Sequence, residues 1–392
     1  MKKSIDLLSP ELQSALELIN SKFSVDTVDW LASLYDKESG GFYYAVSSRD
    51  NDEFWVDIES IVQAISILQR LGMIKCNSDG VWDMPDWFKE KSVNYLQARQ
   101  DESDGYFYDP QYREIADRAK KERNTGFARS CLEDDLNAKP LYKTPYDRLR
   151  ENKASAEVGK EVKNKTDSVY DSEESFVNWL NYLVESRPNS YFWGSDIASA
   201  YSMIKAAGYS KILADWLRKK QYPENGTFEK NFNMTAVNGV LKLVGVFDEV
   251  GEIYPYYEVF LDNVIDFTRE FTPHTAAECW NPLGAMKPIV KNVGDRISKE
   301  LREKLDKNLA ELITNVANKM DAFKKPDGGY SYSKDCSSLY SNNVIVGKAL
   351  PEGDVNAMAL MSLVYLEVYD LVGAEHPAVW RQYKDYFFER IR

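Results

Sequence analysis

The 392-residue sequence predicts an all-α fold in which six helical hairpins close into a ring, an (α/α)6 toroid. Two observations predict it. A short pattern that ends helices returns along the chain, and the segments between its copies are apolar enough to be buried helices. The composition, with 44% hydrophobic and 28% charged residues, is that of an ordinary globular protein with a large core.

The returning pattern is an aromatic residue and Leu, three residues, Gln, four residues, Gly, one residue and a second aromatic residue. It is clearest in "YLQARQDESDGYF" (95–107) and "WLRKKQYPENGTF" (216–228). It recurs with Tyr35 at the Gln position in "WLASLYDKESGGF", with Val184 and Asn189 in "WLNYLVESRPNSY", and in weaker form in "FKKPDGGYSY". Gly and, less readily, Asn adopt a left-handed backbone. Each copy is therefore expected to end a helix in a Gly-type turn, closed by the Gln and the second aromatic residue.

The anchors of these turns set the size of the repeat. They are Gly40, Gly105, Asn189, Gly226 and Gly328, and they give a unit of roughly 40 to 60 residues, the range of repeat architectures. One spacing is widened by a polar, Lys- and Glu-rich segment at about 134–172, which predicts a surface insertion, mobile or forming one solvated helix. The chain is expected to be a single toroid domain, residues 1–392, carrying that insertion.

Six segments are candidates for the inner helices. They lie around 57–71, 112–132, 195–208, 233–245, 275–290 and 354–372. In "DIESIVQAISILQRLG", for example, apolar residues recur at helical spacing from Ile58 to Leu68. Most of these segments are apolar on nearly all sides, which is typical of buried helices, and several begin with Asp or Asn, which cap helix starts. If they run in parallel, their starts share one mouth of the ring.

Charge and composition argue against several classes of partner. The formal net charge of −13 repels the phosphate backbone, so no nucleic-acid partner is expected. The two N-terminal lysines are followed by Asp6, Glu11 and Glu17 rather than by an apolar stretch, so no signal peptide is predicted. No window is expected to provide the roughly 18 apolar residues of a membrane span. The four cysteines lie far apart, and a cytoplasmic location is expected. The oligomeric state is left open.

The repeats resemble those of the terpenoid cyclase and protein prenyltransferase superfamily. The aromatic-Leu-x3-Gln-x4-Gly-x-aromatic pattern is similar to the glutamine–tryptophan repeat of terpenoid cyclases. The stretches "GGFYYAVSSRDNDEFWVDIESIVQAISILQRLG" and "DGGYSY…GDVNAMALMSLVYLEVYDLVG" resemble the Gly-Gly-Phe repeats of prenyltransferase β-subunits. The resemblance covers most of residues 24–392 outside the insertion, and it implies an α/α toroid.

The catalytic motifs of these families are missing from the chain. Neither the Asp-x-Asp-Asp acid of class II cyclases nor the DDxxD motif of class I enzymes is present. At the position matching the prenyltransferase zinc site, Asp354 is present, but Asn356 stands where the family has Cys, and His376 falls on the outer closing helix. No metal and no other cofactor are expected, so the purified protein should carry no stoichiometric zinc in elemental analysis.

Polar and aromatic side chains at the predicted inner-helix starts form the candidate site. The catalytic candidates are Asp57, His274, Glu278 and Asp354. The substrate-binding candidates are Trp55, Trp193, Asp196, Asn238, Trp280, Tyr330 and Asn356. A carboxyl group with a raised pKa beside an ionised partner would suit acid–base chemistry, with two carboxylates within roughly 10 Å. The structural alternatives are an N-cap for each Asp, an exposed or capping role for His274, and core packing for the rings.

Three classes of function fit these features. One is an enzyme acting on a carbohydrate-like small molecule or oligosaccharide, of the glycoside hydrolase or lyase type. The second is a terpenoid cyclase- or prenyltransferase-like enzyme acting on an isoprenoid, and the third is a non-catalytic toroid that binds a ligand or protein. The carboxylates and amides expected at the inner-helix starts favour a polar ligand, and hence the first class.

Overall fold

The computed structural model describes residues 3–157, 168–341 and 344–392. The described α-helices are α1 (Pro10–Asn20), α2 (Val25–Ser33), α3 (Val46–Arg49), α4 (Ile58–Arg70), α5 (Asp86–Gln97), α6 (Arg118–Ser130), α7 (Pro145–Glu157), α8 (Glu173–Ser186), α9 (Ser190–Ser199), α10 (Tyr201–Ala206), α11 (Ser210–Lys220), α12 (Met234–Leu243), α13 (Gly245–Glu249), α14 (Tyr257–Glu270), α15 (Ala276–Val293), α16 (Lys299–Met320), α17 (Val355–Val372) and α18 (Lys384–Ile391).

Shorter elements complete the described chain. The 3₁₀-helices are η1 (Ile5–Leu7), η2 (Pro110–Tyr112), η4 (Ser168–Tyr170), η5 (Gly294–Arg296), η6 (Asp321–Phe323) and η7 (Arg381–Tyr383), and η3 (Cys131–Asp135) is a π-helical turn. The strands β1 (Tyr340–Ser341) and β2 (Val344–Ile345) pair antiparallel, with Tyr340 opposite Ile345.

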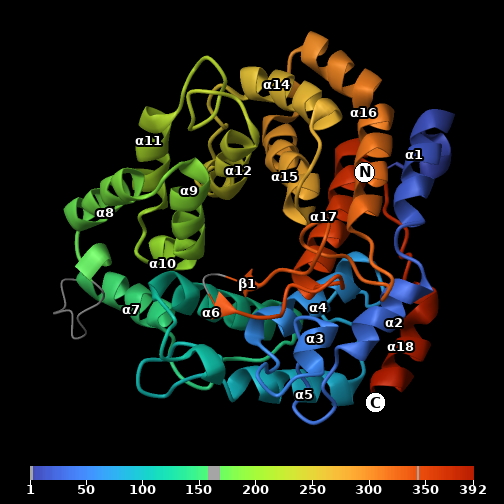
Figure 1. The fold of residues 1–392 in the computed structure, drawn as a ribbon. Coiled ribbons are helices and arrows are strands. Elements are labelled where there is room, and N and C mark those ends of the chain that lie inside the picture. The colour runs from blue at the N-terminus through green and yellow to red at the C-terminus, as the bar shows by residue number, and fades with distance from the viewer. Residues whose placement is uncertain (1–2, 158–167, 342–343) are drawn as a thin grey trace.

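The helices form a closed α/α toroid. The inner ring consists of α4, α6, α9 with α10, α12 with α13, α15 and α17, and each packs on the next until α17 returns to α4 (Figure 1). Helices such as α5, α8, α11, α14 and α16 lie outside this ring. The six inner helices coincide with the six segments predicted from the sequence, so the predicted all-α toroid is confirmed.

The inner helices run in the same direction, because residues in the N-terminal halves of neighbouring helices meet. Glu59 on α4 bonds Arg123 on α6, and Asn238 on α12 bonds Asn281 on α15. Side chains also cap these starts, each accepting from a backbone N–H three residues on: Asp57, Asp117, Asn189, Asn233 and Asp354. The N-termini of the inner helices therefore lie at one mouth of the ring, as predicted.

The repeat turns have the predicted geometry in four copies. Gly40, Gly105, Gly226 and Gly328 all have positive φ, between 70° and 95°. The fifth prediction was wrong: Asn189 has φ of −167° and caps α9 instead. Its side chain is needed to accept the N–H of Phe192, which requires an extended backbone at the cap position.

The Gln of the pattern joins two parts of the outer layer. The Gln221 side-chain amide donates to the carbonyl of Gly226, in its own turn, and to that of Pro255, just before α14, at 3.0 Å each. Gln100 does the same with Gly105 and Tyr142, just before α7. The repeated Gln thus satisfies buried carbonyls and fixes where the next outer helix begins.

Replacing Gln221 by Ala should therefore lower the free energy of unfolding by about 1–3 kcal/mol, because the carbonyl of Pro255 loses its donor. Chemical denaturation followed by circular dichroism measures the change. Gln97→Ala is the matched control, since the Gln97 amide donates to the carbonyl of Lys139 at an exposed site, and it should change stability by less than about 0.5 kcal/mol. Equal effects at the two positions would contradict a structural role for the repeat.

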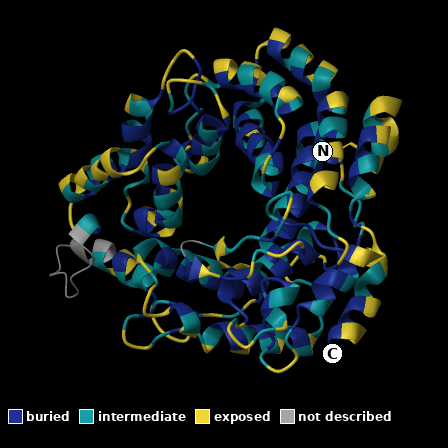
Figure 2. Cartoon of the chain, in the orientation of Figure 1, coloured by how far each residue is buried: buried dark blue, intermediate teal, exposed yellow. Residues whose placement is uncertain are grey.

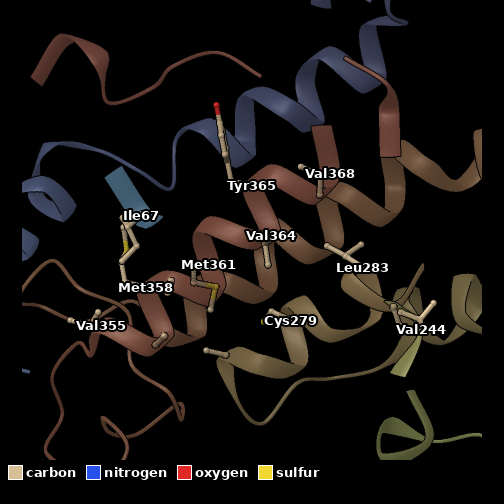
Figure 3. Packing of buried hydrophobic residues seen from close by; sticks show 14 of the residues in the cluster. Ile67, Val244, Cys279, Leu283, Val355, Met358, Met361, Val364, Tyr365 and Val368 are labelled. Carbon is tan, nitrogen blue, oxygen red and sulfur yellow. The ribbon is translucent and has the colours of Figure 1, made fainter. Parts of the chain in front are cut away.

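The core lies between the inner helices and their neighbours. Figure 3 shows Met358, Met361 and Val364 of α17 packed near Ile67 of α4 and Leu283 of α15. Figure 2 shows the buried residues concentrated on the faces where helices meet, with exposed residues on the outside of the ring. By length and composition alone α17 is apolar enough to cross a membrane, unlike the sequence-based expectation, but 61% of it is buried within the protein, as in the core helix of a globular fold.

The predicted insertion is partly built into the outer layer. Helix α7 packs against α10, and Leu149 on α7 is 5% exposed. The Arg148 guanidinium also donates to the carbonyl of Asp104 at 2.8 Å. This part of the insertion is therefore held against the ring rather than freely solvated. Residues 158–167 of the insertion lie outside the described residues.

Candidate functional site

A cavity of about 450 Å³ lies at the centre of the ring. Every inner helix contributes to its wall: α4 through Glu59, Gln63 and Arg70, and the others through residues that include Arg123, Tyr191, Lys242, Trp280 and Asn356. On α4 the lining residues form one stripe from Glu59 to Arg70, a length of about 16 Å at the helical rise. Residues 338, 340 and 341, before and in β1, cover the cavity at the helix-start side.

Glu59 is the centre of a buried charge cluster at this mouth. Its Oε1 accepts from Arg123 Nη2 at 2.6 Å, and its Oε2 lies 3.5 Å from Lys120 Nζ and accepts from Ser341 Oγ at 3.0 Å. Burial would raise the pKa of Glu59, but Arg123 and Lys120 outweigh it and hold that pKa well below its usual value. Glu59 is therefore an ionised, anchored carboxylate and not a proton donor.

Cations outnumber carboxylates in the described cavity wall. The charged residues that line it are Arg70, Arg123, Lys242 and Glu59. Burial, together with the charge of Arg123, lowers the pKa of Lys242 to about 8, and burial lowers that of Arg70 to about 10. The protein as a whole has a net charge of −13 and repels anions, but the cavity has a net positive charge and attracts them.

Polar and aromatic groups line the rest of the wall. Rings come from Phe127, Tyr191, Trp280, Tyr332 and Tyr340. The indole N–H of Trp280 and the side-chain oxygen of Gln63 are buried, and neither has a hydrogen-bond partner among the described residues. Leaving such groups unpaired costs about 1–3 kcal/mol each.

The structure places the four catalytic candidates outside this wall. Asp57 and Asp354 are buried caps of α4 and α17. Glu278 accepts the backbone N–H groups of His274 and Thr275, which closes the start of α15, and His274 is exposed. The carboxylates among them satisfy helix ends, which is the structural alternative raised for the Asp residues. The expected pair of carboxylates is not found in the described cavity wall, where Glu59 is the one acid.

Only some of the substrate-binding candidates reach the cavity. Trp280 and Asn356 line it, and Asn238 lies behind the wall, where it accepts a hydrogen bond from the lining residue Asn281 at 2.7 Å. The other candidates lie elsewhere: Trp55 is 52% exposed, Trp193 packs on Trp216 and Phe228, Asp196 pairs with Arg187, and Tyr330 donates to the carbonyl of Lys22.

The cavity cations lie away from the helix starts, where the sequence pattern places its candidates. Arg70 ends "DIESIVQAISILQR", and Lys242 is the one charged residue of "NMTAVNGVLKLVG". A lone cation in a segment that is otherwise apolar all round is costly to bury in a core. That feature could have indicated a residue facing a central cavity. Arg123, in the more polar "DRAKKERNTGFARS", carries no comparable signal.

No cluster of three His, Cys, Asp or Glu side chains suited to a metal occurs in the described part of the chain. The absence of zinc stays a prediction for elemental analysis.

The chain is similar to solved structures only at low sequence identity. No family model matches the chain, and no curated protein matches it. Similar solved structures include a glycoside hydrolase family 15 glucoamylase from Hypocrea jecorina, 11% identical, with a TM-score of 0.42, covering 93% of this chain and 74% of that one. A type II terpene cyclase from Scytonema is also 11% identical, with a TM-score of 0.43, covering 93% of this chain and 99% of that one. At these values neither protein supports a particular activity.

Proposed function

We propose that the protein is an enzyme that binds a small, hydroxylated carboxylate of the acidic-sugar class in its central cavity and acts on it by acid–base chemistry. The observation that carries this proposal is the charge of the cavity wall, in which Arg70, Arg123 and Lys242 face one ionised carboxylate, Glu59. A bound carboxylate lowers the formal charge of the wall from +2 to +1. The polar side chains of Ser195, Ser199 and Asn356 line the cavity and can pair with hydroxyl groups.

The same charges favour elimination over hydrolysis. Hydrolysis of a glycosidic bond by a carboxylate pair needs two acids, one of them protonated, and Glu59 is both single in the described wall and ionised. Removing a proton beside a carboxylate needs instead a cation that neutralises the carboxylate and a base whose pKa lies near the working pH. Arg123 or Arg70 can supply the cation. Lys242, with its pKa at about 8, can take the proton from carbon and, as an ammonium, give it to the leaving oxygen.

The isoprenoid alternative fits the cavity less well. The apolar residues Leu360 and Leu363 of α17 line part of the cavity. Arg70, the last residue of α4, also lines it. The Arg70 guanidinium makes two long donations, both of 3.3 Å, to the carbonyl of Ala359 and the hydroxyl of Ser362, and the charges of Glu367 and Asp135 offset its burial only in part. An apolar tail placed there would bury this charge further without pairing it, which is unfavourable.

Isothermal titration with D-glucuronate and D-galacturonate tests the proposal, with D-glucose and geranyl diphosphate as the competing ligand classes. A uronate should bind at least about tenfold more tightly than glucose, since one charge-assisted hydrogen bond contributes about 1.5–3 kcal/mol. Lys242→Met and Arg70→Met should each weaken uronate binding by about tenfold or more. Lys291→Met, at an exposed position on α15, is the control and should leave it unchanged.

Two outcomes would overturn the proposal. Preferential binding of geranyl diphosphate would favour an isoprenoid enzyme, and equal binding of uronate and glucose would remove the role of the cations. Incubation with uronate-containing oligosaccharides then tests the chemistry, because elimination creates a conjugated double bond that absorbs in the ultraviolet. Release of saturated sugars without that absorbance would show hydrolysis instead.

A further inference from the structure

Lys242 is the one lysine in the described wall of the central cavity. It is the penultimate residue of α12, lines the central cavity, and has neither an ion pair nor a hydrogen bond among the described residues. Lys120 and Lys287, by contrast, both pair with glutamates, Glu59 and Glu367. The Lys242 ammonium lies over the ring of Tyr191, 5.7 Å from its centroid.

Close packing of α9 on α12 holds the Lys242 stem in place. Gly194 on α9 faces the Lys242 side chain, and a Cβ at Gly194 would lie only 3.3 Å from the Lys242 Cβ. Because glycine has no side chain, α9 and α12 approach closely at this position. The Lys242 side chain therefore extends from a packed helix and not from a loop. A rigid amine at a cavity wall is positioned for repeated reaction with a bound group.

The surroundings of the amine favour its neutral form. Burial and the neighbouring positive charge of Arg123 lower the pKa of Lys242 to about 8. At pH 7.5 roughly a quarter of such an amine is neutral, about two hundred times the fraction of a solvated lysine. A lysine desolvated beside another cation is a recognised arrangement for nucleophilic amines.

We propose that Lys242 forms a covalent imine with the aldehyde or ketone group of an anionic oxo compound that the cavity cations hold. This inference rests on the proposed function and deepens it, because it assigns a carbonyl group to the ligand. With a ligand that carries a free carbonyl group, Lys242 acts as the nucleophile and not as the base. The open-chain form of a uronic acid meets both requirements, with a carboxylate at one end and an aldehyde at the other. Arg123 or Arg70 pairs with the carboxylate, while the aldehyde reaches Lys242.

The reaction balances without a further reagent. The lone pair of the neutral Nζ attacks the carbonyl carbon, and the electron pair of the C=O bond moves to oxygen, which takes up a proton from the attacking nitrogen. The carbinolamine then loses water as the C=N bond forms. Amine and carbonyl thus become imine and water, with nothing oxidised or reduced.

Reductive trapping tests the inference. The protein is incubated at pH 7.5 with D-glucuronate and cyanoborohydride, which supplies the reducing equivalents, and modified lysines are located by peptide mass spectrometry. The expected adduct on Lys242 has the mass of the ligand less one oxygen atom. It should form at least tenfold faster than on the exposed Lys291 and Lys299, and Lys242→Arg should remove it while those two surface lysines react as before.

The methyl glycoside of glucuronate separates this inference from the proposed function, because it keeps the carboxylate and has no free aldehyde. It should protect Lys242 from trapping and bind on its own in titration. If the methyl glycoside binds but Lys242 reacts no faster than Lys291, the imine is overturned and the proposed function stands. If neither uronate form binds, the proposed function fails, and any adduct that still forms selectively on Lys242 supports the amine chemistry alone.

Discussion

Replacing Asp354 by Ala should lower the free energy of unfolding by about 3–5 kcal/mol, the largest loss expected from a single polar residue in this protein. The Asp354 carboxyl caps α17 through the N–H of Ala357 at 2.7 Å. It also accepts from the N–H of Tyr332 at 2.7 Å and from the hydroxyl of Tyr44 at 3.1 Å. All of these donors would be left buried without an acceptor. Urea denaturation at fixed pH measures the change.

Ser9→Ala provides the matched control for this prediction. Ser9 caps α1 through the N–H of Leu12 at 3.4 Å, at an exposed helix end, and its loss should cost about 0.5–1 kcal/mol. The same experiment decides between two roles of Asp354. A variant that keeps its stability and loses uronate turnover would show that Asp354 is catalytic. A variant that loses stability would show that Asp354 is structural and connects α17 with Tyr44 and Tyr332.

The fold could be predicted because its signals are local. The turn glycines such as Gly226 need a positive φ, and the Gln five residues earlier needs carbonyls to donate to, so one short pattern specifies a complete helix end. The inner helices could be recognised because burial on all sides leaves segments such as 355–372 with few polar residues. Where the same pattern was degenerate, as at Asn189, capping of the next helix was the stronger requirement.

The site was harder to predict because helix starts and cavity walls use the same residue types. An Asp that begins an inner helix, such as Asp57, accepts a backbone N–H and does not line the cavity. Glu59, two residues later, has no such role and points to Arg123. That pairing joins two helices far apart in sequence, and it depends on the rotation of each helix in the ring, which composition and spacing do not encode.

Asp57 is expected to contribute less to the stability of the protein as the pH rises, which is the reverse of the usual effect of a carboxyl group. Burial and the nearby Asp109 raise the pKa of Asp57 to about 7, although Lys120 opposes this. Asp109 itself accepts from the N–H of Ile58 at 2.8 Å and from the Asn124 amide at 3.0 Å. Because the pKa of Asp57 is raised in the native state, the native protein binds more protons than the unfolded chain between about pH 4 and pH 7. The stability from this group is fully present below about pH 4 and is lost as the pH rises through 7.

Asp57→Asn should therefore make the protein more stable at pH 8, by about 2–4 kcal/mol, and change its stability little at pH 4. The Asn oxygen can still cap α4 through the N–H of Ser60, which Asp57 now bonds at 2.8 Å, while the repulsion with Asp109 disappears. Denaturation from pH 4 to pH 8 measures the difference, and Asp117→Asn, at the exposed cap of α6, sets the baseline for exchanging a capping Asp for Asn. A variant that is less stable than the wild type at pH 8 would contradict this prediction. It would show that the attraction of Lys120 for the ionised Asp57 carboxylate outweighs its burial and its repulsion by Asp109.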